Sequence, residues 1–179
     1  MIKAKYIAMA VIFLFGMWGG NELIKRLSNE PEAQLAATSM VGKPIPDFSL
    51  PDLDNHQHNI HEWDGNVVVL NFWATWCPPC LKETPLFVEM QEQYGPKGLQ
   101  FIGVAIDTLE KVKDFVDTYG VNYPTLIATD KDIHIAEAYG NRFGALPYTV
   151  VINRQGQISH IHRGEFSREA VKENVLSLL

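Results

Sequence analysis

One stretch of this chain constrains its fold more than any other: an apolar run, two cysteines and a helical pattern follow one another without a break. Residues 67–72 read VVVLNF, which is typical of a strand buried on both faces. Residues 78–94 carry apolar side chains four apart and end at a Gly-Pro pair, which predicts a helix that Pro85 kinks. Cys77 and Cys80 therefore lie where a central parallel strand passes into a helix.

The rest of the domain alternates strand-like and helix-like segments and ends with an antiparallel hairpin and a helix. This order predicts an α/β domain with a mixed central sheet and helices on both faces. The expected elements are a loose hairpin within 42–63, a strand over 99–106, a helix over 109–119 capped by Asp107 and closed by Gly120, a short strand over 124–128, a helical turn or two over 133–139, a hairpin of 148–152 with 157–162, and a last helix capped by Ser167.

The N-terminus carries a targeting signature. Two lysines precede the apolar run 6–20, which has no ionisable group except one phenol. Extended to residue 24, this run approaches the roughly 20 residues needed to cross a bilayer, and no small-x-small cleavage pattern follows it directly. We therefore expect residues 1–24 to form a membrane anchor, with a cleaved signal peptide as the alternative. The lysines before the run favour an N-terminus inside and a domain outside the cytoplasm.

Residues 25–40 are polar and alanine-rich without strong apolar periodicity, which predicts a linker. The folded domain is then expected over residues 41–179. The chain has 15 basic and 21 acidic residues, a net charge of −6, and no long basic run. Nucleic acid is therefore not expected as a partner.

The chain has only two cysteines, with two residues between them. A bond between them closes too small a loop to staple a fold, so their use is expected to be chemical. The positive end of the helix dipole favours the thiolate of Cys77, which we expect to be the exposed attacking residue. Cys80, one turn later and more buried, is expected to resolve the mixed disulfide. Pro78 and Pro79 restrict the loop, remove two amide donors and so tune the redox potential.

A zinc site is the structural alternative for this cysteine pair. Zinc needs further ligands, and the nearest candidates, His160 and His162, do not have the usual spacing. Three more histidines, at positions 56, 58 and 61, cluster in the expected N-terminal hairpin, where exposed side chains are the commoner explanation. We assign no metal and no cofactor.

Residues 72–80, FWATWCPPC, resemble the active site of the thioredoxin superfamily, especially its membrane-tethered TlpA and ResA-like branch. The similarity covers residues 41–179. Further segments resemble family motifs in order, namely GKPIPDF at 42–48, ETP at 83–85, the strand region 98–107 and LPYT at 146–149.

The resemblance implies a thioredoxin-like fold with an inserted helix and a reductive role in the periplasm or its equivalent. It also implies a membrane thiol-disulfide electron donor and selected protein disulfides as substrates, for example in cytochrome c or copper-oxidase assembly. We expect a monomer.

Two positions near the cysteines are interpreted through the resemblance. Asn71 stands where cytoplasmic thioredoxins carry a buried aspartate that moves a proton for the resolving cysteine, and an amide cannot do so. Glu83 matches the acidic residue of the ResA-like branch and lies within reach of Cys80 on one helix face. A solvated surface glutamate is the alternative.

Other matched positions concern the substrate. Pro147 matches the family's cis-proline, which lies against the active-site disulfide and presents backbone groups to an extended substrate. Its alternative role is to open a strand edge. Trp76 is expected to form an apolar lip beside Cys77, together with Pro78 and Pro79, and Trp73 is expected to pack in the core.

Two rival functions share these features. Peroxiredoxins need threonine or serine three residues before the cysteine, where this chain has Ala74, so a peroxidase is not expected. A metal- or apoprotein-binding chaperone of the copper-carrier type remains the alternative, because a soft metal suits two thiolates.

Overall fold

The computed structural model describes residues 32, 35 and 37–179, and its compact unit runs from Ala36 to Leu179. The expected membrane segment, residues 1–24, lies outside the described residues. Among the residues that are described, no helix has the length and apolar character needed to span a bilayer.

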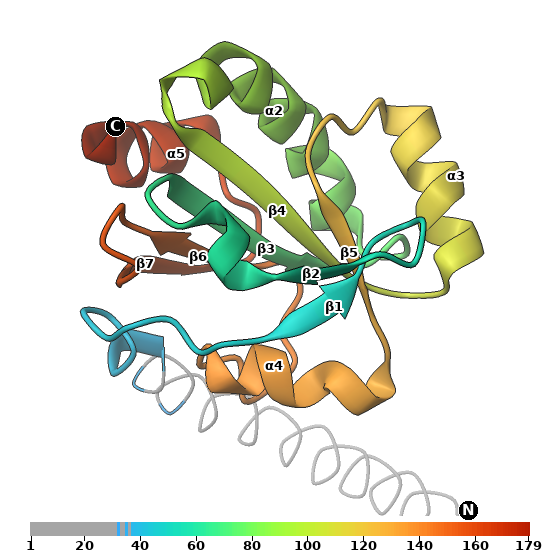
Figure 1. Cartoon of the computed structure of the whole chain (residues 1–179), viewed down its shortest axis with the longest axis horizontal. Coiled ribbons are helices and arrows are strands. Elements are labelled where there is room, and N and C mark those ends of the chain that lie inside the picture. Colours follow the sequence, from blue (N-terminus) through green and yellow to red (C-terminus); the bar gives the residue numbers. More distant parts are fainter. Residues whose placement is uncertain (1–31, 33–34, 36) are drawn as a thin grey trace, which may run out of the picture. The chain divides into compact units, whose positions relative to one another are not determined.

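A five-stranded mixed sheet forms the centre of the domain, in the order β5-β4-β3-β6-β7 (Figure 1). The strands are β3 Val67–Trp73, β4 Leu99–Ile106, β5 Thr125–Ala128, β6 Tyr148–Ile152 and β7 Ile158–Arg163. The central strand β3 runs parallel to β4 and antiparallel to β6. Every residue of β3 is buried, as expected for a strand covered on both faces. The predicted mixed sheet is thereby confirmed.

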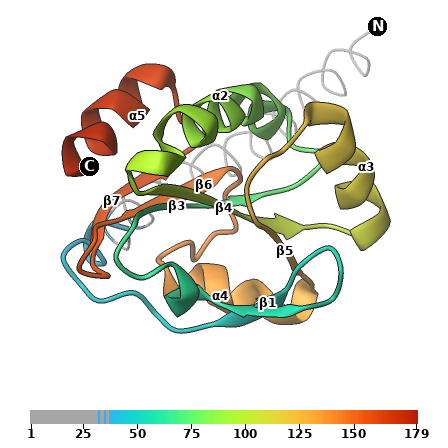
Figure 2. The same ribbon diagram turned by 45° about the horizontal axis from the view of Figure 1, so that its top comes forward.

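Helices cover both faces of this sheet (Figure 2). They are α2 Pro78–Tyr94, α3 Leu109–Tyr119, α4 Ile133–Ala138 and α5 Arg168–Asn174. Phe87 of α2 and Val171 of α5 pack with Val69 of β3 on one face, whereas Ile135 of α4 packs with Leu70 of β3 on the other. The alternation of side chains along β3 thus supplies two separate apolar layers.

An N-terminal hairpin precedes the sheet, as predicted. Its strands β1 Ser49–Pro51 and β2 Gln57–Asn59 pair antiparallel, and a 3-10 turn, Ile60–Trp63, follows with a capping box at Asn59. The segment leading into this hairpin contacts the β7 edge, because Gly42 N–H donates to the Ile158 carbonyl at 2.8 Å. After β1, Asp52 bridges Leu126 on the β5 edge.

The element boundaries agree closely with the sequence expectations, and several ends differ by one residue, as in β7, which is Ile158–Arg163 instead of 157–162. The central strand extends to Trp73. The strand expected from Pro124 begins at Thr125, since proline has no N–H to contribute to a ladder. Packing begins before residue 41, because Ala37 is buried and Met40 packs against the core.

The expected helix caps are confirmed at two positions and wrong at one. Gly120 closes α3 in the left-handed region at φ 62°, and Ser167 accepts a hydrogen bond from Ala170 N–H at the start of α5. The N-cap of α3 is Thr108 instead of Asp107. The Asp107 carboxylate accepts a hydrogen bond from the Thr75 hydroxyl, a contact across the sheet that local pattern does not reveal.

Candidate active site

The two cysteines lie at the junction of β3 and α2, as predicted. Cys77 is the N-cap residue of α2 and Cys80 lies in its first turn. They form a disulfide with 5.3 Å between the two Cα atoms. The Cys77 N–H donates to the Ala74 carbonyl at 3.2 Å, which closes a tight turn before the helix. The sheet and the helix together fix the position of this pair.

The expected difference in exposure between the two cysteines is wrong for the disulfide form. Cys77 is 3 % exposed and Cys80 is 1 % exposed. The cause is an apolar cluster in which both cysteines pack with Trp73 of β3 and Phe115 of α3. Trp73 is therefore a core residue, as expected.

Trp76 supplies the exposed apolar surface next to the cysteines, with 65 % of the residue accessible. Pro78 is also exposed and Pro79 is half-buried. These three side chains thus form the accessible surface beside Cys77, and the sequence pattern indicates all of them.

The peptide bond between Leu146 and Pro147 is cis, as the family resemblance implied. Pro147 is buried immediately before β6, and its carbonyl accepts a hydrogen bond from Gly164 N–H at 2.9 Å. Leu146 packs against the cluster that contains both cysteines. This loop therefore lies beside the redox centre.

Glu83 is buried, with 2 % of the residue exposed, so the alternative of a solvated surface glutamate is wrong. The Asn71 side-chain amide donates to Glu83 Oε1 at 2.9 Å and to Thr149 Oγ1 at 3.0 Å. Phe166 N–H donates to Glu83 Oε2 at 2.8 Å. The amide that replaces a thioredoxin's aspartate thus holds the carboxyl group of α2 in place.

Burial raises the pKa of Glu83 to about 8, although the hydrogen bonds from Phe166 and Asn71 act in the opposite direction. The negative charge of Glu165 adds to the increase. A carboxyl group whose pKa is near neutral can both accept and release a proton under working conditions. It lies one helical turn beyond Cys80.

Comparison with known proteins agrees with this geometry. The redoxin family model matches residues 40–179. The chain belongs to the redoxin family. The thiol-disulfide oxidoreductase ResA of Halalkalibacterium halodurans is 37 % identical over 133 residues, which are 74 % of this chain and 73 % of that protein. The ResA of Geobacillus thermodenitrificans is 33 % identical over 139 residues, 77 % of this chain and 78 % of that protein.

Solved structures show the same architecture. A thiol:disulfide interchange protein of the thioredoxin family from Chlorobium tepidum superimposes with a TM-score of 0.67 at 30 % identity, covering 76 % of this redoxin and 95 % of that chain. A secreted thiol-disulfide isomerase from Corynebacterium glutamicum superimposes with a TM-score of 0.67 at 25 % identity, covering 75 % and 84 %. The redoxin described here is therefore a ResA- and TlpA-like protein disulfide oxidoreductase with a thioredoxin-like fold.

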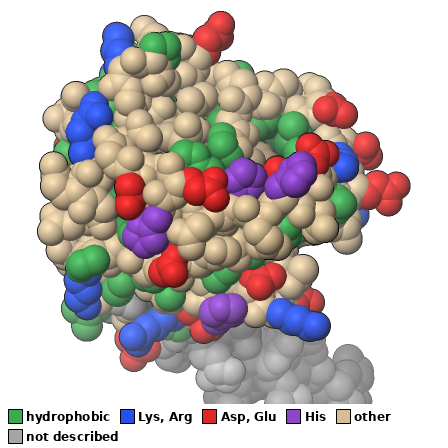
Figure 3. All heavy atoms as spheres, viewed as in Figure 1, with side chains coloured by type: hydrophobic (Ala, Val, Ile, Leu, Met, Phe, Trp, Pro, Cys, Tyr) green, Lys and Arg blue, Asp and Glu red, His purple; other side chains and the backbone are tan. Residues whose placement is uncertain are grey.

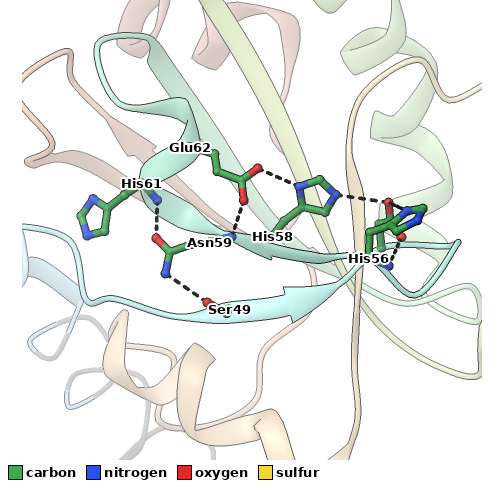
Figure 4. Close-up of polar contacts among 7 residues, drawn as sticks. Ser49, His56, His58, Asn59, His61 and Glu62 are labelled. Atoms are coloured by element: carbon green, nitrogen blue, oxygen red, sulfur yellow. Dashed lines mark hydrogen bonds and ion pairs between the residues drawn. The ribbon is translucent and has the colours of Figure 1, made fainter.

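The histidines of the N-terminal hairpin pair with carboxylates (Figure 4). His58 lies between two of them, with Nδ1 2.8 Å from Glu62 Oε2 and Nε2 3.2 Å from Asp52 Oδ2. His61 Nδ1 lies 3.1 Å from Asp64 Oδ2. On the face seen in Figure 3, histidines lie next to acidic side chains. These rings have roles in the hairpin itself, and we assign no metal to them.

The sequence pattern does not reveal three partners of the site: Thr149, Phe166 and the Asp107 contact with Thr75. Thr149 lies on β6 and Phe166 precedes α5, so neither is a local neighbour of the residue that it contacts. The pairing of β3 with β6 places Thr149 opposite Asn71.

Proposed function

We propose that this redoxin reduces disulfides of protein substrates outside the cytoplasm, with Cys77 as attacking and Cys80 as resolving residue. The observation that carries the proposal is the Cys77–Cys80 disulfide at the start of α2, with the buried carboxyl group of Glu83 one turn further along. Reduction of a substrate requires that the dithiol form of the pair reacts first.

In the proposed cycle, the Cys77 thiolate attacks one sulfur of the substrate disulfide, and that S–S bond breaks as a mixed disulfide forms. The Cys80 thiolate then attacks Cys77 Sγ, which releases the second substrate thiol and leaves the Cys77–Cys80 disulfide. The substrate gains two electrons and two protons. A membrane thiol-disulfide donor reduces the enzyme again.

Glu83 takes up the proton that Cys80 must lose before it attacks. This role is supported by a pKa of about 8, which allows the carboxylate to receive a proton near neutral pH. Both groups are shielded from bulk water, since Cys80 and Glu83 are 1 % and 2 % exposed, which favours a proton acceptor inside the protein. Both residues belong to the same helix, which fixes their spacing.

Trp76, Pro78, Pro79 and Pro147 contact the substrate in this proposal. The exposed indole of Trp76 offers apolar area beside Cys77. The loop at Leu146 and Pro147 lies against the cysteine cluster, where in this proposal it receives an extended substrate chain.

An anchored location is supported by the charged and apolar pattern of residues 1–24. The reductive direction, and cytochrome c or copper-oxidase assembly as the setting, are proposed from the resemblance of residues 72–80 and 83–85 to the TlpA and ResA-like branch. We further propose that the protein is a monomer and that it does not bind nucleic acid.

Trapping tests the assignment of the two cysteines. Cys80→Ser should accumulate mixed disulfides between Cys77 and substrate proteins, because the attacking thiol remains and the resolving thiol is gone. The matched control, Cys77→Ser, should accumulate none, and equal capture by both variants would contradict the assignment.

The reduction potential of the Cys77–Cys80 pair tests whether the protein reduces or oxidises its substrates. A value near thioredoxin's roughly −270 mV indicates a reductant, and one near about −120 mV indicates an oxidant.

A further inference from the structure

Thr75 and Asp107 occupy equivalent places at the ends of two neighbouring parallel strands. Trp73 of β3 is in register with Ala105 of β4, and Thr75 and Asp107 each follow two residues later. The carboxyl ends of parallel strands meet at one edge of a sheet, where α/β proteins place their functional groups. At this edge the chain turns into α2 on one side and into α3 on the other.

The Asp107 carboxylate connects these two strand-to-helix junctions. Its Oδ2 accepts a hydrogen bond from the Thr75 hydroxyl, and its Oδ1 accepts one from Thr108 N–H at 2.8 Å. Lys111 Nζ lies 3.4 Å from Oδ1, and the Asp107 side chain is 5 % exposed. Burial alone would raise the pKa of Asp107, but the hydrogen bonds from Thr75 and Thr108 and the charge of Lys111 lower it. The group therefore remains an acceptor throughout the working pH range.

Thr75 belongs to the turn that delivers the attacking cysteine. The turn begins at Ala74, whose carbonyl accepts from Cys77 N–H at 3.2 Å. Trp76, between Thr75 and Cys77, is exposed and gives the turn little packing. The hydrogen bond from the Thr75 hydroxyl to the Asp107 side chain thus links this turn to the end of the neighbouring strand, β4.

The start of α2 makes the exact conformation of this turn important. The first N–H groups of a helix stabilise an anion at its N-cap. Pro78 and Pro79 follow the N-cap Cys77 directly, and neither has an N–H. Cys80 therefore supplies the first backbone N–H of α2, and a Cys77 thiolate depends on few donors. A small rotation of the turn moves the sulfur away from them.

We propose that Asp107 is a positioning residue for the attacking thiol: through Thr75 it holds the Ala74–Cys77 turn so that the reduced Cys77 sulfur faces the amino end of α2. The proposal rests on the assignment of Cys77 as the attacking residue, which the trapping experiment tests separately, so the positioning role can fail while that assignment holds. Asp107 contacts neither substrate nor sulfur in this role. It acts through the Thr75 hydroxyl.

Two variants separate the hydrogen bond from the charge of Asp107. Thr75→Val removes the hydroxyl and keeps both the shape and the negative charge. Asp107→Asn removes the charge and keeps a carbonyl oxygen that can accept from Thr75. A carboxylate that acted only through its charge would disfavour the thiolate. Charge removal then lowers the Cys77 pKa, whereas loss of the positioning bond raises it.

The test measures the pH midpoint of Cys77 alkylation by iodoacetamide in the full-length reduced chain, on a Cys80→Ser background that leaves one thiol to titrate. Thr75→Val should raise the midpoint by roughly 0.5 to 1 unit, which makes the thiolate about three to ten times scarcer below the midpoint. Thr75→Ser retains the hydroxyl and should restore the original midpoint. Asp107→Asn should not raise it.

Arg168→Gln provides the matched control, because Arg168 on α5 pairs with Glu89 on α2 away from the cysteines. It should leave the midpoint unchanged. Lys111, which pairs with Asp107, and the buried Glu83 of α2 remain in every variant. An unchanged midpoint in Thr75→Val, or equal shifts in Thr75→Val and Thr75→Ser, would overturn the proposal. So would a lower melting temperature in Thr75→Val with the wild-type midpoint, since that outcome indicates a purely structural bond.

Discussion

The carboxyl group of Glu83 on α2 and the carboxyl groups of the N-terminal hairpin lie in opposite environments. Glu83 is buried on α2 and receives hydrogen bonds from two neutral donors, Asn71 and Phe166 N–H, yet burial raises its pKa to about 8. Glu62 is exposed beside β2, and its hydrogen bond with His58 lowers its pKa. Hydrogen bonds alone therefore do not decide the protonation of a carboxyl group. Desolvation dominates where no cation is present to oppose it.

Asp52 shows the intermediate situation within the hairpin. Its burial acts to raise its pKa, but hydrogen bonds from the backbone of His56 and Asp54 and from the His58 ring lower it to about 2. Asp52 and Glu62 are therefore charged near neutral pH, and both stabilise local structure through these hydrogen bonds. Glu83 alone in this comparison changes protonation near neutrality, as proton transfer requires.

The largest expected effect is on the pH dependence of stability. The pKa of Glu83 is about 8 in the folded chain against 4.5 for an ordinary glutamate. Between these values the folded state binds the proton and the unfolded state does not, so the free energy of unfolding falls as pH rises, by up to about 1.4 kcal/mol per pH unit. Below pH 4.5 and above pH 8 this contribution is constant.

Urea unfolding at pH 5 and pH 8, in the wild type and in Glu83→Gln, measures this contribution as a difference. The variant lacks the titrating group, so its stability should decrease less between the two pH values. Parallel pH profiles for the two proteins would show that Glu83 titrates normally in the fold.

The second prediction concerns the rate at which the mixed disulfide is resolved. Glu83→Gln removes the proposed proton acceptor for Cys80, and loss of a general base slows such a step by about 10² or more. Stopped-flow measurement of product release should show this decrease. The thiol titrations of the reduced pair should also move closer together, as macroscopic values of a coupled system. Unaltered values of both would assign the proton directly to water.

The third prediction is a loss of stability when Asn71 is replaced. Asn71→Leu keeps the approximate volume but leaves Glu83 Oε1 and Thr149 Oγ1 without their shared donor. An unpaired buried polar group costs about 1 to 3 kcal/mol, so the free energy of unfolding should decrease by about this amount. Thr149→Val gives the matched control, because it removes one acceptor and leaves Glu83 paired. A variant as stable as the wild type would mean that the network contributes nothing.

The smallest effect is expected in the hairpin. The hydrogen bond to Glu62 raises the pKa of His58 above 6.5 despite the opposing effect of burial. The added stability is therefore present at pH below 6.5 and is lost as pH rises through the higher folded pKa. The His58 side chain is 31 % exposed, which limits the contribution to less than about 1 kcal/mol. Thermal unfolding of His58→Gln at pH 5.5 and pH 8.5 should show a decrease at the lower pH only, and a larger loss at pH 8.5 would contradict this.

The sequence predicts the parts of the site that depend on local pattern. The apolar strand, the two cysteines and the start of α2 follow one another along the chain, so the order of residues alone indicates their arrangement. Pro147 and Glu83 are indicated by the family resemblance. The burial of Cys77 is not predicted, because it depends on Phe115 of α3 packing near the disulfide. Asp107 is expected to cap a helix, whereas its contact with Thr75 results from strand register.

The segment leading into the N-terminal hairpin bridges β7 near Ile158, and the end of β1 bridges β5 at Leu126. These strands are the two outer members of the central sheet. Exposed sheet edges invite pairing with any extended chain, which leads to aggregation. A protein disulfide oxidoreductase meets other polypeptide chains as substrates, so coverage at both edges discourages indiscriminate strand addition to this sheet.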